Sequence, residues 1–194
     1  MWASEPIPFD PMETALHEAY RNLGAEDERP HFKMAHEYPL GGKPPMMTHI
    51  FSNSAGEKKI AAKGAPEAIM NVCNLSDEEK QKIINAIETI TKEGYRVLGV
   101  AKSDFAGDSY PKHQQELPFS FLGIAGFNDP PKANISKVLE DFYQAGISVK
   151  IITGDNAATT QAIAKRINFK GSEKSLSGDE LMQISDADLQ KTVM

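Results

Sequence analysis

Residue types suited to phosphate binding occur where Thr153-Gly154-Asp155 follows the apolar run 149–152. That run predicts a strand, and the pattern from about Asn156 predicts a helix, so the tripeptide would occupy a strand-to-helix junction. Open α/β sheets bind ligands at the carboxyl ends of strands, and helix N-termini favour phosphate. A structural alternative makes Gly154 a turn residue and Asp155 or Asn156 a helix cap. Taken alone, so short a motif favours the structural alternative.

Two further positions carry groups that could reach a ligand. Asp129 closes the apolar run 119–127 and is separated from Asp155 by one helical crossover. Because parallel strands end at the same sheet edge, we expect Asp129 and Asp155 to lie close together. Lys63-Gly64 ends another β-like run, where the ammonium could reach a ligand and the glycine would leave it space. By itself, Lys63 is more simply a solvated strand-end residue.

The elements of the N-terminal part predict an antiparallel sheet with flanking helices. A helix should begin at the cap Asp10 and end at Gly24, with an apolar face that includes Leu16, Ala19, Tyr20 and Leu23. The runs 46–51 and 58–63 predict a hairpin, followed by a short helix through residue 72. A capping box at residues 76–79 begins a longer helix that stops at residue 94, and residues 95–101 predict the next strand.

The C-terminal part has a different pattern. From Phe119 the order is a strand at 119–127, a helix near 135–142, a strand at 147–152 and a helix near 156–167. This alternation predicts part of a parallel sheet. We place the boundary near Leu122, so that residues 1–121 form one domain and residues 122–194 a truncated second one. The expected fold class is α/β in the broad sense, or α+β.

Composition excludes several function classes. The 194 residues carry a net charge of −6 with scattered Lys and Arg, which disfavours nucleic acid or direct membrane contact as partners. The single cysteine, Cys73, excludes an internal disulfide, and no Cys/His spacing predicts a metal site. No run approaches the roughly 20 apolar residues of a membrane-spanning helix, so the chain as written is expected to be soluble.

Four motifs in a fixed order resemble the P-type ATPases, in the branch of calcium pumps and related bacterial cation pumps. They are DPMETAL at 10–16, KGAPE at 63–67, GFNDPPK at 126–132 and KIITGDN at 150–156. The resemblance implies a nucleotide-binding domain joined to part of a haloacid-dehalogenase-like phosphorylation domain. It also implies ATP and Mg²⁺ as cofactors, and a parent membrane protein that couples ATP hydrolysis, through an aspartyl phosphate, to cation transport. The segment would be a cytoplasmic part of that pump, with the actuator and membrane domains as partners.

The resemblance assigns roles around the nucleotide. It implies that Glu13 and Lys63 line the adenine pocket together with Gly64, and that Arg96 contacts the ATP phosphates and links the two domains. One wall departs from the family pattern, because Leu40 stands where a phenylalanine would stack on adenine. Stacking is worth about 1 kcal/mol beyond burial, so either ATP binds weakly or Tyr38 substitutes through a register shift.

In the second domain, the resemblance implies a group of residues around the γ-phosphate, its magnesium and the hinge. These residues are Asp129, Thr153, Gly154 and Asp155. Lys132 stands where many relatives have arginine, which keeps the charge but loses the bidentate fork.

The residue that the family phosphorylates is missing, since no aspartate of this chain is followed by lysine. We therefore assign no catalytic residue, expect no turnover by the segment alone, and expect the segment to be the middle part of a pump. Lys63→Ala should weaken nucleotide binding while leaving the fold intact. Two alternatives stay open: a degenerate domain that binds a protein partner, and a fragment of a haloacid-dehalogenase-type phosphatase.

Overall fold

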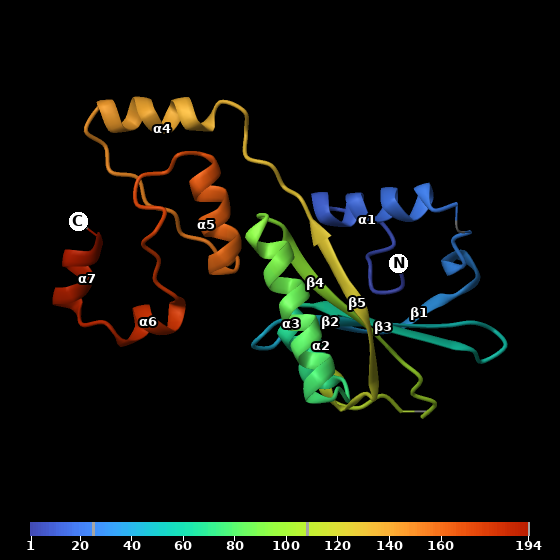
Figure 1. The fold of residues 1–194 in the computed structure, drawn as a ribbon. Helices are drawn as coiled ribbons and strands as arrows, with labels where there is room; N and C mark the ends of the chain where they lie inside the picture. Colours follow the sequence, from blue (N-terminus) through green and yellow to red (C-terminus); the bar gives the residue numbers. More distant parts are fainter. Residues whose placement is uncertain (25, 108, 194) are drawn as a thin grey trace. The chain divides into compact units, whose positions relative to one another are not determined.

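The structure, a computed structural model, describes residues 1–24, 26–107 and 109–193 (Figure 1). The chain divides into two compact units, one made of Met1–Asn85 and Val97–Phe127 and the other of Ala86–Arg96 and Asn128–Met194. The boundary predicted near Leu122 falls inside a strand of the first unit. The limits of the two domains stay a prediction.

A five-stranded sheet, in the order β1-β2-β3-β4-β5, confirms the predicted antiparallel sheet. Its first three neighbouring pairs are antiparallel, and β2 and β3 form the predicted hairpin with Met47 opposite Lys63. Asn53 tightens the connecting turn, because its side-chain oxygen accepts from the N–H groups of Ala55 and Glu57. The strands are β1 Lys33–Gly41, β2 Met46–Ser52, β3 Lys58–Gly64, β4 Arg96–Ser103 and β5 Phe119–Phe127.

Local capping signals begin the helices where the sequence predicts them. Asp10 caps α1 (Pro11–Asn22) by accepting from the N–H of Glu13 at 2.8 Å. Ser76 and Glu79 form the predicted capping box of α3 (Asp77–Lys92), while α2 (Pro66–Val72) begins with proline at its first position. Short 3₁₀ turns occupy η1 Arg29–His31 and η2 Gln114–Glu116.

Both faces of the sheet are covered in the first unit. Every residue of β2 from Met46 to Phe51 is buried, although successive side chains point to opposite faces. One face packs Ile50 and Ala62 against Ile69 of α2. The other face carries Lys63 and lies under α1 and the N-terminal segment (Figure 1).

The inward face of α1 differs from the predicted apolar one. Leu23 is 80% exposed and Ala19 is also exposed, whereas Glu13 is buried. Glu13 has a charged partner on the sheet, so the face of α1 that lies on the sheet includes a charged residue.

The second unit contains the predicted helices but not the predicted parallel sheet. The run 147–152 has no regular secondary structure, and Ile152 is 98% exposed. Residues 119–127 do form a strand, but it extends the antiparallel sheet beside β4. Among the described residues no strand runs beside 147–152, so its backbone lacks the partners that a strand requires. The helices are α4 Ile135–Gln144, α5 Ala157–Arg166, α6 Gly178–Gln183 and α7 Asp186–Val193.

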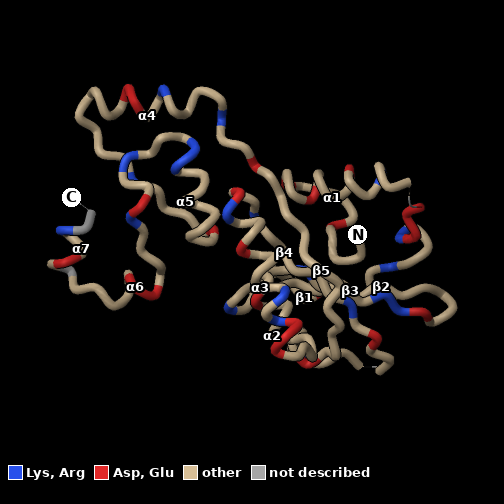
Figure 2. Tube along the Cα trace, in the orientation of Figure 1, with Lys and Arg blue, Asp and Glu red and all other residues tan. Residues whose placement is uncertain are grey.

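Both units carry Lys and Arg as well as Asp and Glu, and strands β2 and β5 carry none of these residues (Figure 2). In the part of the chain that the structure describes, no helix has the length and apolarity needed to cross a membrane.

Candidate functional site

A buried ion pair joins Glu13 of α1 to Lys63 of β3. Glu13 is 4% exposed and Lys63 is 8% exposed, and Oε1 of Glu13 contacts Nζ of Lys63. The cap at Asp10 fixes the first turn of α1, and the β2–β3 register turns Lys63 toward that turn. Oε2 of Glu13 is buried and has no hydrogen-bond partner. The pair thus leaves one buried acceptor unused.

Burial is the main influence on the charge of Lys63. It lowers the pKa of Lys63 below the ordinary value of a lysine, while the nearby carboxylates of Asp10 and Glu5 oppose that shift. A buried ammonium without a partner would be costly, and Glu13 supplies the opposite charge. The interpretation of Lys63 as a solvated strand-end residue is therefore wrong.

Gly64 is required by close packing of the chain. A Cβ at this position would lie 2.5 Å from the carbonyl oxygen of Pro45 and 2.6 Å from Cα of Met46. The next residue, Ala65, donates its N–H to the same Pro45 oxygen at 2.9 Å. The glycine of the KGAPE motif therefore lets the end of β3 approach the start of β2.

The geometry does not support the prediction that Tyr38 provides the aromatic ring that the family has at the position of Leu40. Leu40 is 65% exposed on β1. Tyr38 pairs with Thr48 and belongs to the core on the α2 face, where its hydroxyl donates to the carbonyl of Pro111 at 2.5 Å. Lys63 pairs with Met47, so its side chain lies on the opposite face of the sheet from Tyr38.

A second group of predicted residues meets within the second unit. Nε of Arg96 lies 2.9 Å from Oδ1 of Asp155, and the hydroxyl of Thr153 accepts from the N–H of Asp155 at 3.0 Å. Asn156 caps α5 by accepting from the N–H of Ala158 at 2.8 Å, as the structural alternative predicts. The loop before α5 is therefore held by side-chain contacts around Asp155.

The chain just before β4 helps to hold α5 near Arg96. The hydroxyl of Thr159 donates to the carbonyl of Tyr95 at 3.1 Å, and Arg166 donates to the carbonyl of Glu93 at 2.7 Å. These bonds connect segments far apart in the sequence, so the Arg96–Asp155 contact does not stand alone.

Asp129 and Lys132 are not drawn into that group. Both are exposed, and their side chains make no hydrogen bond or ion pair with the described residues. At Gly154 an added Cβ would meet nothing within 4 Å, so packing does not require glycine there. Their predicted roles around a phosphate stay predictions.

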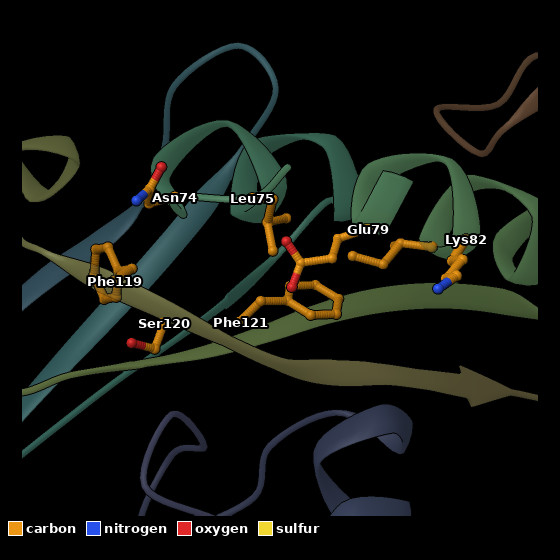
Figure 3. Close-up of a pocket in the computed structure, with 8 residues that line it drawn as sticks. Asn74, Leu75, Glu79, Lys82, Phe119, Ser120 and Phe121 are labelled. Atoms are coloured by element: carbon orange, nitrogen blue, oxygen red, sulfur yellow. The ribbon is translucent and has the colours of Figure 1, made fainter. Parts of the chain in front are cut away.

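A surface pocket lies between α3 and β5 of the first unit, and it was not predicted (Figure 3). The two charged side chains of its lining already have partners within α3 and its cap. Glu79 accepts from the N–H and hydroxyl of Ser76 at 2.8 and 2.7 Å, and Lys82 pairs with Glu78 at 2.7 Å. The lining residues are Asn74, Leu75, Glu79, Lys82, Ile83, Phe119, Ser120 and Phe121.

Comparison with known proteins identifies the family. Residues 9–134 match the family described as P-type ATPase, cytoplasmic domain N, a span that includes the Glu13–Lys63 pair and Arg96. The chain belongs to the P-type ATPases. The resemblance of its motifs to this family is thereby confirmed.

The chain is also similar in sequence to individual P-type ATPases. The chain is 32% identical to the sodium/potassium exporting P-type ATPase cta3 of Schizosaccharomyces pombe, over 84% of the chain and 17% of that protein. It is 29% identical to the calcium-transporting ATPase of Bacillus subtilis, over 95% of the chain and 22% of that protein. Calcium-transporting ATPase 1 of Saccharomyces cerevisiae is also 29% identical, over 95% of the chain and 21% of that protein. The chain thus spans about a fifth of the length of these relatives.

Proposed function

We propose that this segment of a P-type ATPase binds ATP at the Glu13–Lys63 pair, and that its parent pump couples ATP hydrolysis through an aspartyl phosphate to cation transport. The observation that carries the proposal is the buried, unpartnered Oε2 of Glu13 beside the Lys63 ammonium. A buried acceptor without a donor is rare in folded proteins, and the exocyclic amine of adenine is a donor that would satisfy it. Lys63 supplies a cation for the same ligand.

The same contacts support weak binding. Lys63 already engages Oε1 of Glu13, so a nucleotide must share or displace that ion pair. Leu40 is largely exposed and offers no aromatic face to adenine. The proposal is therefore a low-affinity site whose specificity comes from polar contacts.

Arg96 and its neighbours would act on the phosphates in the parent pump. Asp155 and Thr153 lie beside Arg96 within the second unit, and the exposed Asp129 and Lys132 complete the group assigned by family order. Magnesium would serve to neutralise phosphate charge, and carboxylate oxygens such as those of Asp129 are the ligands it prefers. In the parent pump we expect this second unit to form part of a haloacid-dehalogenase-like sheet on the cytoplasmic side of the membrane.

An ATP titration of the ¹⁵N-labelled chain, followed by NMR, tests the binding site. We expect fast-exchange shifts concentrated near Glu13 and Lys63, with saturation only at millimolar ATP. A charge-free variant, Glu13→Gln with Lys63→Met, should lose these shifts. Lys59→Met is the matched control, because Lys59 lies on the same face of β3 and pairs with the exposed Glu57 at 2.7 Å. If millimolar ATP produces no shifts, the binding proposal fails and a protein-interaction module becomes the better explanation.

A phosphate-release assay tests the lack of turnover. The purified chain with ATP and Mg²⁺ should release no phosphate above a protein-free blank, because no aspartate followed by lysine is present to accept the phosphoryl group. Reproducible release that follows the chain through purification would contradict this expectation.

A further inference from the structure

A histidine with two unused ring nitrogens lies inside the first unit, on the sheet face that carries Lys63. His49 of β2 is fully buried, and neither Nδ1 nor Nε2 has a hydrogen-bond partner. A neutral imidazole has one donor and one acceptor, and buried polar groups nearly always use theirs. This unsatisfied ring therefore points to a missing partner.

Two carboxylates approach the same ring. Glu37 of β1 lies directly opposite His49 in the β1–β2 register, which places the two side chains on one face. Glu5 comes from the N-terminal segment, with Oε1 3.8 Å from Nε2 of His49. One ligand atom from each of these three residues lies within 4.8 Å of the other two.

Packing of the N-terminal segment holds Glu5 in place. Trp2 packs edge-on against Phe51 of β2, with ring centroids 5.3 Å apart, and Ser4 is only 2% exposed. His17 of α1 bonds to the carbonyl oxygen of Glu5 at 2.9 Å. The carboxylate of Glu5 is therefore presented to His49 by a packed segment.

The donor set suits a divalent transition cation. Imidazole nitrogen is a good ligand for Zn²⁺, and carboxylate oxygens complete many sites of this kind. With metal–ligand bonds of about 2.0–2.2 Å, tetrahedral ligand atoms lie roughly 3.3–3.6 Å apart. Glu5, at 3.8 Å from His49, is already close to that separation, and the 4.8 Å limit on the other distances leaves at most about 1.5 Å to close. Glu5 is half-buried and Glu37 is exposed, which leaves the carboxylates room to move and water room to complete the coordination.

We propose that Glu5, Glu37 and His49 form a binding site for a divalent first-row transition cation, with Zn²⁺ as the representative ion. The site ties the N-terminal segment to β1 and β2, and none of its three residues belongs to the Glu13–Lys63 pair. It was missed in the sequence because its residues have no metal-site spacing and meet only through strand pairing and the packing of the N-terminal segment.

Isothermal titration of the full chain with ZnCl₂, without nucleotide or chelator, tests the site. We expect one-to-one binding, and with CoCl₂ a visible d–d absorption band of matching stoichiometry. Glu37→Gln should weaken binding at least about tenfold without unfolding the chain, because Glu37 is exposed. His49→Gln should abolish binding, with circular dichroism as the check of its fold.

Glu28→Gln and His31→Gln are the matched controls, since both residues are exposed and lie outside the cluster. The affinity of each control variant for Zn²⁺ should equal that of the unaltered chain. The ring nitrogens of His49 should also shift in NMR spectra on addition of Zn²⁺. An absence of one-to-one binding, or equal affinity in Glu37→Gln and the controls, would overturn the proposal, whatever the outcome of the ATP titration.

Discussion

Replacing Lys63 by alanine should destabilise the first unit strongly. The variant leaves the carboxylate of Glu13, which is 4% exposed, with no partner for either oxygen. Breaking one side of a buried ion pair costs about 3–5 kcal/mol. The side chains of Lys63 and Glu13 are only 11% and 6% exposed, so solvent screening reduces this cost little. This expectation differs from the sequence-based prediction that Lys63→Ala leaves the fold intact, and the measurement below decides between the two.

A double substitution separates the charge effect from the loss of packing. Glu13→Gln with Lys63→Met removes both charges and keeps side chains of similar length, so its unfolding free energy should lie within about 1–2 kcal/mol of the unaltered chain. Because each single variant leaves one buried charge unpaired at a cost of about 3–5 kcal/mol, a double-mutant cycle should give a coupling energy of at least about 4 kcal/mol. Lys59→Met should change the unfolding free energy by less than about 1 kcal/mol, because Lys59 is only half-buried and its partner Glu57 is exposed.

Urea denaturation followed by tryptophan fluorescence measures these differences. Trp2 is the single tryptophan, and its ring lies 5.0 Å from that of Phe32 and 5.3 Å from that of Phe51, so its emission reports on the face that carries Lys63. A loss of less than about 1 kcal/mol in Lys63→Ala, the range of solvated pairs, would refute the buried pair. The buried pair would also be refuted if the double variant Glu13→Gln with Lys63→Met were no more stable than Lys63→Ala.

Three further outcomes test other parts of the first unit. Gly64→Ala should lower the melting temperature, with a loss of about 1–3 kcal/mol, because its Cβ would lie 2.5 Å from the oxygen of Pro45. Burial raises the pKa of the Tyr38 phenol, so the unfolded chain loses this proton first and stability should fall as pH rises above about 10. The urea midpoint should fall less steeply with pH in Tyr38→Phe than in the unaltered chain. Equal slopes in the two proteins would contradict this prediction. Burial also raises the pKa of the Cys73 thiol, so a disulfide reagent should label it slowly until urea is added.

Local signals in the sequence predict the elements of the first unit well. The cap at Asp10 and the box at Ser76 and Glu79 depend on residues three positions apart, and each forms the expected hydrogen bond. The hairpin of β2 and β3 likewise follows from two β-like runs and a short polar turn. Interactions between residues a few positions apart restrict the local backbone conformation, and for this reason they can be predicted from the sequence.

Non-local partners decide the features that the sequence does not predict. Lys63 is buried against Glu13 of α1, and the residues around Lys63 in the sequence do not indicate that α1 packs there. The run 147–152 has the apolar pattern of a strand, but a pattern supplies no backbone partner, and among the described residues Ile152 remains exposed. The cluster of Glu5, Glu37 and His49 requires three separate segments to meet.

Lys63 and Arg96 appear equivalent in the sequence, as cations at strand ends, but the structure gives them different energetic roles. The Arg96–Asp155 contact joins side chains that are 46% and 31% exposed, and such solvated pairs are worth about 0–1 kcal/mol. Arg96 can therefore exchange a carboxylate for a phosphate at little cost. Lys63 is buried with Glu13, and any nucleotide that takes its ammonium must compensate the carboxylate left behind. The low affinity expected for ATP thus arises mainly at the Glu13–Lys63 pair, and a nucleotide whose base amine also satisfies Oε2 of Glu13 is the ligand that best offsets that cost.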